Sequence, residues 1–417
     1  MEKSTLKTRL WALAATLLLL VSLLALPVSA ANVAPTANLQ TTFNKYLVMD
    51  ANANVPNAEF EFTITAGSAV DATTGSSRSI YAGNDALRVV GFPVLKVDGT
   101  GNKTTAKVNF VAGDTTYGSI QDGDILELGN EEKYAKKTVT VAFNDVDFNA
   151  PGIYRYIITE KNDANQQGIS YDDPNTRTLD VFVEYENVDQ GTLKVSNYVL
   201  YPGTKTDTTD VDNGTKDDGF TNTYTTYDLT LAKTVTGNQG DRDKYFEFTV
   251  NISGAVNGTV YTVDLSGAEA SPIVDGKTKS NLATLTATNG SVEATYYLKH
   301  GQSIVIQGLT ADTKYTIAET SYSTDGYSTA YNVKVGEEEV VASTTSNSTG
   351  ERTMSIASTG PEGTAKTGDH TVIFTNDKQG TVPTGILLET APYLILGAVV
   401  VAGLVVLFAT RRRRSRE

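Results

Sequence analysis

Two long segments of this 417-residue chain repeat the same strand pattern, and each places one lysine on an otherwise apolar strand face. Successive side chains of a β-strand point to opposite faces, so residues two apart share a face. The first such face contains Phe43, Lys45, Leu47 and Met49. The second contains Leu229, Leu231, Lys233 and Val235. A buried charge without a partner is strongly destabilising, so each lysine requires a polar neighbour from elsewhere in its segment.

Both segments supply the same two polar candidates later in the chain. A glutamate ends an inward-facing row, which is Tyr154, Tyr156, Ile158 and Glu160 in the first segment and Tyr315, Ile317 and Glu319 in the second. A Phe-Thr-Asn sequence closes each segment, and its asparagine is Asn222 or Asn376. This internal repeat indicates two structural units of the same kind.

The repeat and a composition rich in Thr, Val, Tyr, Asn and Gly predict an all-β protein. We expect two tandem β-sandwich domains, residues 31–225 and 226–380, with a boundary near residue 225. Residues 66–130 are interrupted by Gly, Ser, Thr and Asp, which predicts short strands joined by long loops.

The Lys, Glu and Asn of each unit have two interpretations. The simpler one is a buried salt bridge with an asparagine hydrogen bond. The other follows from burial, which lowers the pKa of a lysine and raises that of a glutamate, and so favours a neutral amine beside a carboxylic acid. A neutral amine is a nucleophile. Held against an asparagine carboxamide that the acid polarises, it displaces ammonia and leaves a Lys-Asn isopeptide bond, with the acid carrying the proton.

Charge and composition exclude several functions. The formal net charge is −14, which disfavours nucleic acids and anionic lipids as partners. The two histidines, His300 and His370, lie in no cluster with ligand spacing, so we expect no metal and no cofactor. No Ser-His-Asp arrangement is visible either, and a secreted hydrolase is poorly supported. We expect no enzymatic activity on an external substrate.

The two ends of the chain carry export signals. Residues 1–30 combine basic residues, an apolar run and the small residues Val28-Ser29-Ala30, which predicts a signal peptide cut near Ala30 or Ala31. Residues 391–410 are uncharged and would span about 30 Å as a helix, enough to cross a bilayer. The basic tail, residues 411–417, would stay on the cytoplasmic side. The absence of cysteine in an exported chain implies that it resists unfolding without disulfides.

Residues 381–385, directly before this span, resemble the cell-wall sorting signal of Gram-positive surface proteins. The motif consists of Val382, Pro383, Thr384 and Gly385. The resemblance implies that a sortase cuts between Thr384 and Gly385, so that the membrane anchor is temporary. Val382 stands where leucine is commoner, a variant similar to that of pilins, and this implies a pilin-type sortase.

The repeated units resemble the isopeptide-containing domains of Gram-positive pilins, especially the streptococcal backbone type, and are Ig-like or Cna-B-like sandwiches in that family. The second unit is also similar to the B-type modules of collagen adhesins. The resemblance implies isopeptide bonds from Lys45 to Asn222 and from Lys233 to Asn376. It assigns Glu160 and Glu319 the catalytic role in forming them.

Pilin shafts also need an exposed lysine that attacks the acyl-sortase of the next subunit. Lys205, in Tyr201-Pro202-Gly203-Thr204-Lys205, is displaced by two residues from the Tyr-Pro-Lys motif of some pili. Lys216 lies six residues before Asn222, closer to the streptococcal pattern. The sequence does not choose between them, and either would otherwise be an ordinary loop lysine.

The resemblance therefore predicts a structural pilus subunit on the cell wall of a Gram-positive bacterium, with a role in adhesion and colonisation. Its expected partners are a pilin-type sortase, further copies of itself, peptidoglycan, minor pilins and host surface ligands. The alternative is an adhesin or minor pilin that is anchored to the wall without polymerising and binds a host ligand through residues 66–130.

Overall fold

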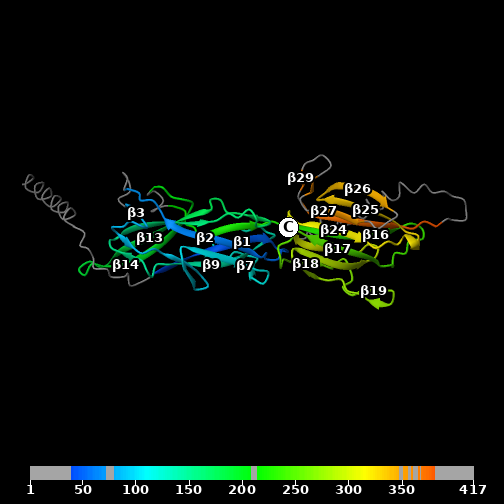
Figure 1. The fold of residues 1–417 in the computed structure, drawn as a ribbon, viewed down its shortest axis with the longest axis horizontal. Helices are drawn as coiled ribbons and strands as arrows, with labels where there is room; N and C mark the ends of the chain where they lie inside the picture. The colour runs from blue at the N-terminus through cyan, green and yellow to red at the C-terminus, as the bar shows by residue number, and fades with distance from the viewer. Residues whose placement is uncertain are drawn as a thin grey trace, which may run out of the picture.

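The structure, a computed structural model, describes residues 39–71, 79–207, 214–346, 351–355, 358–359, 365–366 and 368–380. Figure 1 shows two β-rich units placed end to end along the long axis of the molecule. We call them unit 1, the described residues from 39 to 225, and unit 2, those from 226 to 380. Within the described residues, the helical structure is a single 3-10 turn, η1 (Ser323–Asp325). The predicted all-β fold class is confirmed.

Unit 1 contains two main sheets. The first has the order β12-β15-β1-β9-β5-β6, with β8 also paired to β9. Its strands are β12 (Ile169–Ser170), β15 (Gly219–Tyr224), β1 (Gln40–Asp50), β9 (Glu132–Ala142), β5 (Val94–Val97), β6 (Thr100–Lys103) and β8 (Thr116–Tyr117). The first and last long strands of the unit, β1 and β15, are parallel neighbours.

The second sheet of unit 1 has the order β14-β13-β11-β2-β7, with β3 paired to β11. Its strands are β14 (Thr192–Pro202), β13 (Thr176–Asn187), β11 (Gly152–Glu160), β2 (Ala58–Ala66), β7 (Thr105–Phe110) and β3 (Ile80–Ala82). A small separate pair is formed by β4 (Val89–Val90) and β10 (Asp147–Phe148). Residues 80–117 thus contain mostly short strands, as the interrupted sequence predicts.

The core of unit 1 lies between its two sheets. Leu47 of β1 and Val139 of β9 come from the first sheet, while Phe60 of β2, Ile158 of β11 and Val181 of β13 come from the second. All five are buried in one hydrophobic cluster. The two-residue period of each strand directs its apolar side chains into this layer.

Unit 2 repeats the arrangement with a seven-stranded sheet, β21-β18-β23-β16-β30-β25-β26, and a four-stranded sheet, β22-β17-β24-β27. The first consists of β21 (Thr284–Thr286), β18 (Val260–Asp264), β23 (Ser303–Leu309), β16 (Tyr227–Thr236), β30 (His370–Asp377), β25 (Ser328–Val335) and β26 (Glu338–Ser346). The second consists of β22 (Ser291–Leu298), β17 (Phe246–Ser253), β24 (Lys314–Glu319) and β27 (Glu351–Ser355). Two short pairs are β19 (Ile273–Val274) with β20 (Lys277–Thr278) and β28 (Ser358–Thr359) with β29 (Ala365–Lys366). Here too the first and last strands, β16 and β30, are parallel neighbours.

The units meet where β15 ends and β16 begins, with only residues 225–226 between them. Side-chain amides of unit 1 donate to backbone carbonyls of unit 2 across this joint. Asn54 Nδ2 lies 2.9 Å from the carbonyl oxygen of Val260, and Gln167 Nε2 lies 2.8 Å from that of Gly254. β15 runs parallel to β1 toward the joint, and β30 runs parallel to β16 away from it.

Candidate functional site

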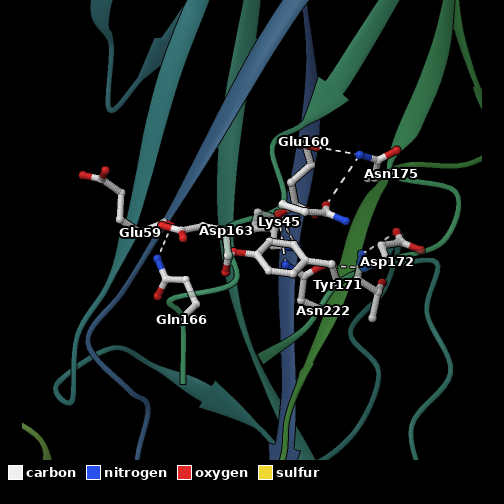
Figure 2. Close-up of polar contacts among 12 residues, drawn as sticks. Lys45, Glu59, Glu160, Asp163, Gln166, Tyr171, Asp172, Asn175 and Asn222 are labelled. Carbon is white, nitrogen blue, oxygen red and sulfur yellow. Dashed lines mark hydrogen bonds and ion pairs between the residues drawn. The ribbon is translucent and has the colours of Figure 1, made fainter. Parts of the chain in front are cut away.

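In unit 1 the strand register places the lysine and the asparagine on the same inner face. Lys45 of β1 is paired with Phe220 of β15, and the next inward position of the pair joins Leu47 to Asn222. Lys45 and Asn222 are therefore diagonal neighbours across a parallel strand pair. Glu160, the last residue of β11, approaches them from the opposite sheet. Figure 2 shows the three side chains converging in the space between the sheets.

The three groups are in direct contact and completely buried. Lys45 Nζ lies 2.8 Å from Glu160 Oε1, and both side chains are 0% exposed. Asn222 Nδ2 donates to the same oxygen over 3.1 Å. A single carboxylate oxygen therefore touches both the amine and the amide nitrogen.

The surroundings of Lys45 favour its neutral form. Burial lowers its pKa to about 8, although the Glu160 carboxylate acts in the opposite direction. The Phe60 ring, whose centroid lies 4.7 Å from Nζ, likewise attracts the charged form and acts against the effect of burial. Burial also raises the pKa of Glu160, against the opposing effect of Lys45. Both shifts bring the pair closer to a neutral amine beside a carboxylic acid.

The carbonyl of Asn222 has a partner that the sequence interpretation lacked. The backbone N–H of Asp172 donates to Asn222 Oδ1 over 2.9 Å. An N–H can only donate, so it fixes the carboxamide with its oxygen toward Asp172 and its nitrogen toward Glu160. The sequence interpretation had the carboxylic acid polarise this carbonyl. In the structure, Glu160 instead faces the nitrogen that would leave.

Unit 2 brings together the corresponding residues in the same register. Lys233 is paired with Phe374 and Val235 with Asn376, so Lys233 and Asn376 are again diagonal neighbours. Lys233 Nζ lies 2.9 Å from Glu319 Oε1, with both side chains 0% exposed. Burial lowers the pKa of Lys233 to about 8 and raises that of Glu319.

The two sites differ at the asparagine. Asn376 is close enough to affect the pKa of Glu319. Yet among the described residues neither Asn376 Oδ1 nor Nδ2 has a hydrogen-bond partner of normal geometry. Unit 2 therefore has no donor there equivalent to the Asp172 N–H.

The histidines serve in the packing of unit 2. His300 Nδ1 accepts from the backbone N–H of Val235 over 3.0 Å. His370 is buried on β30, with Nδ1 2.9 Å from the hydroxyl of Tyr315. In the described part of the chain, no group of three or more His, Cys, Asp or Glu side chains is arranged to hold a metal ion.

The two candidate polymerisation lysines lie in different surroundings. Lys216 is exposed and stands three residues before β15 begins. Lys205 follows β14 and is half-buried. Its backbone N–H donates to Thr178 Oγ1 over 2.9 Å, and its carbonyl accepts from Arg155 Nη1 over 3.1 Å.

The remaining sequence motifs lie outside the described residues. These are the signal peptide at 1–30, Val382, Pro383, Thr384 and Gly385 of the sorting motif, the apolar segment 391–410 and the basic tail 411–417. A search of the described portion alone finds no helix with the length and apolar character needed to cross a bilayer.

Comparison with known proteins gives matches to both units. Residues 41–225 match the model of the Spy0128-like isopeptide-containing domain. Residues 227–378 match a model described as a domain of unknown function (DUF7601). A pilin of Streptococcus pyogenes serotype M1 is 28% identical over 371 residues, which cover 88% of each chain. These matches support a Gram-positive pilin of the backbone type.

Other relatives of this pilin include the pilus tip adhesin Cpa of Streptococcus pyogenes, 33% identical over 128 residues that make up 28% of this chain and 16% of the adhesin. The crystal structure of the major pilin from Streptococcus pyogenes aligns with a TM-score of 0.49 at 22% identity, over 83% of this chain and 100% of that one.

The polar residues that surround the unit 1 site of this pilin were missed from the sequence. Asp172, which lies beside Asn222, carries no pattern that separates it from the many other acidic loop residues. Arg177 is 5% exposed on β13, contacts Asp172, and shares its strand face with the core residues Leu179 and Val181. A basic residue within an otherwise buried strand was the one available signal.

Proposed function

We propose that this pilin is a shaft subunit whose two domains each close an internal Lys-Asn isopeptide bond without an external enzyme. The observation that carries this proposal is the repeated buried arrangement of a lysine, a glutamate and an asparagine on adjacent first and last strands. The bonds join Lys45 to Asn222 and Lys233 to Asn376. The proteins similar to this chain are structural proteins, which agrees with a reaction between side chains of the pilin itself.

Proton transfer within the trio is supported by the contact geometry. The lysine gives a proton to the glutamate and attacks the asparagine carbonyl carbon as a free amine. Glu160 Oε1 touches both Lys45 Nζ and Asn222 Nδ2, so it accepts the proton of the attacking nitrogen and passes it to the departing one. Ammonia leaves, and the new amide is held between the sheets. Glu319 takes this role in unit 2.

Polymerisation is proposed to proceed through a pilin-type sortase that cuts between Thr384 and Gly385 and transfers Thr384 to a lysine of the next subunit. Lys216 is favoured as that lysine, since it is exposed and precedes β15, the strand that runs toward the joint with unit 2. Residue 380 follows β30, which runs away from the joint with unit 1. This arrangement supports head-to-tail addition. Lys205 is the second candidate.

The proposed setting is the cell surface, where the pilin assembles with further copies of itself and other pilins and is finally attached to peptidoglycan. A transient membrane anchor at residues 391–410 precedes sortase cleavage. The alternative function is that of a wall-anchored adhesin that does not polymerise. A test of polymerisation must distinguish this adhesin from a shaft subunit.

Cell-wall extracts of a strain expressing the pilin test the proposal. We expect a ladder of denaturant-resistant bands that requires the sortase and persists in the Lys205→Ala variant. Lys216→Ala should reduce the ladder to a single band while leaving the monomer folded. A single band for the unaltered pilin would contradict the shaft function and favour the adhesin. A ladder lost only in Lys205→Ala would move the acceptor to that residue.

A further inference from the structure

The segment around Asp172 is fastened to the strand that carries Asn222. The Asp172 carboxylate accepts from the backbone N–H of Thr221 over 2.9 Å and forms an ion pair with Arg177 Nη2. Thr221 is the residue directly before Asn222. The side chain of Asp172 is therefore tied to β15 next to the proposed cross-link.

Arg177 is itself held from several sides. Its Nε donates to the Gly219 carbonyl over 2.7 Å and lies 2.6 Å from Asp217 Oδ2. Its guanidinium stacks over Phe220, 4.5 Å from the ring centroid. A guanidinium that is 5% exposed, with this many contacts, has little freedom to move. Asp172 is therefore positioned by a rigid partner.

This positioning brings the backbone N–H of Asp172 to the carbonyl oxygen of Asn222, 2.9 Å away. Negative charge develops on that oxygen when the amine adds to the carbonyl carbon. A donor already in place, in a site without bulk water, stabilises such a charge without reorganisation. The Asp172 N–H is therefore placed to stabilise the negative charge that develops on Asn222 Oδ1 in the transition state.

We propose that the backbone N–H of Asp172 is the oxyanion donor for isopeptide formation in unit 1, and that the Asp172 carboxylate and Arg177 are the positioning groups that hold it there. This inference rests on the proposed cross-link between Lys45 and Asn222. Figure 2 shows the Tyr171–Asp172 segment beside Lys45, Glu160 and Asn222.

The reaction balances with these groups alone. Lys45 Nζ, after giving one proton to Glu160, bonds to Asn222 Cγ, and the carbonyl π electrons move to Oδ1 under the Asp172 N–H. When the carbonyl re-forms, the Cγ–Nδ2 bond breaks. The second proton lost by Nζ and the proton held by Glu160 both pass to Nδ2 through the carboxylate, so that ammonium leaves and Glu160 returns to its starting carboxylate. No oxidant, metal or further reactant takes part.

Removing the N–H while keeping every side chain is the most direct test. The full chain is prepared with Asp172 replaced by its α-hydroxy acid analogue, which exchanges the backbone N–H for an ester oxygen. The chain is recovered unfolded, refolded, and quenched at intervals. Proteolysis and mass spectrometry then follow the cross-linked peptides of each unit separately, while circular dichroism follows folding.

We expect the cross-link of unit 1 to form roughly 100-fold more slowly, the usual effect of removing one oxyanion donor. Folding and the unit 2 cross-link should keep their rates, because Asn376 has no corresponding donor among the described residues. Asp172→Ala should also slow unit 1, Asp172→Asn should restore part of the rate, and Asp173→Ala, at an exposed neighbour, should have no effect.

The possible results separate this inference from the proposed function. An unaltered chain that never loses ammonia from unit 1 would overturn the cross-link itself and the inference with it. A normal unit 1 rate in the ester variant, with the cross-link present in the unaltered chain, would overturn only the oxyanion role. Equal slowing of folding and cross-linking would assign Asp172 a purely structural role.

Discussion

Lys45 and Lys233 are each buried beside a single carboxyl group, and this isolation decides their chemistry. Apart from the ion pair with Glu160 or Glu319, neither Nζ has a hydrogen-bond partner of normal geometry in the described structure. An ammonium has three donors to satisfy, so both lysines are under-solvated as cations. In the proposed reaction, transfer of one proton to the carboxylate relieves this state and creates the nucleophile.

The same pairs predict how cross-link formation depends on pH. The reactive pair holds one proton between lysine and glutamate. A second proton is added as the pH falls through the raised pKa of Glu160, which removes the free amine. The last proton is lost as the pH rises through the Lys45 pKa of about 8, which removes the proton needed by the leaving ammonia. We therefore expect the refolding-coupled rate to be flat near neutral pH and to fall on both sides.

Mass spectrometry of samples refolded at a series of pH values measures this profile. The upper limb should lie near pH 8 for both units, because the pKa of Lys233 is also lowered to about 8. A rate that keeps rising to the ordinary lysine range near pH 10.5 would contradict the shifted lysines.

At the scale of strands, the proposed cross-link depends on the close parallel contact of β1 and β15. Gly219 opens β15 directly beside Asn44 of β1, and a side chain there would overlap the Asn44 carbonyl oxygen. Glycine is therefore required at this point for the two backbones to approach. The contact sets the register in which Lys45, one residue farther along β1, and Asn222, three residues farther along β15, are diagonal neighbours.

Gly219→Ala should push the start of β15 away from β1. We expect a loss of about 1–3 kcal/mol in the free energy of unfolding, typical of overpacking, and slower cross-linking in unit 1 with unit 2 unchanged. Denaturant titration and cross-linked peptide analysis check both effects. Gly113→Ala, at a site with open space, is the matched control. Equal behaviour of the two variants would show that β15 tolerates the displacement.

The strands differ in how much of them the sequence predicts. Alternation of apolar residues predicted β1, β11 and β16, since only the two-residue period places Lys45, Glu160 and Lys233 on inner faces. It did not predict the burial of Arg155, which occupies the opposite face of β11. Arg155 pairs there with Asp180, Nη2 to Oδ2 2.8 Å, and both side chains are 0% exposed. Burial of that face depends on chain packed over it from far along the sequence.

The role of Asp172 is beyond sequence reasoning for another reason. Its contribution is a backbone N–H, which every residue except proline possesses. Only the folded chain shows which of these donors meets the Asn222 carbonyl. The trio itself was accessible from sequence because its charged members interrupt apolar faces.

For the whole molecule, the proposed links define which parts carry load in a pilus. Tension would enter at Lys216 and leave at Thr384. The covalent path between them runs along β15 and β16, crosses from Lys233 to Asn376, and leaves along β30. Lys216 and Asn222 lie on the same chain segment, so force passes from one to the other along the backbone. The bond from Lys45 to Asn222 is therefore not part of the path that carries the tension. The two cross-links therefore have different mechanical tasks.

Single-molecule pulling between these points tests the difference. The chain has no cysteine, so Lys216→Cys and Gly380→Cys provide unique handles. We expect Glu319→Ala to add roughly 450 Å of extension, since about 140 residues are released at ~3.3 Å each. Glu160→Ala, the matched variant in unit 1, should add none. Equal lengthening in both variants would contradict the proposed path.

Both cross-links should still stabilise their units thermodynamically. Each closes a loop of well over 100 residues, and by analogy with a disulfide this restricts the unfolded chain by about 5 kcal/mol. That magnitude is comparable with the whole stability of a typical domain. Such a contribution would keep the exported pilin folded without cysteine.

The most direct test is the intact mass of residues 31–380, purified folded from a host that has no sortase. The unaltered protein should be lighter than its sequence mass by two molecules of ammonia. Lys45→Ala and Asn222→Ala should each regain one, Lys233→Ala and Asn376→Ala should each regain the other, and a double variant should have the full mass. A folded, unaltered protein with its full sequence mass would contradict the cross-links and leave both trios as buried salt bridges.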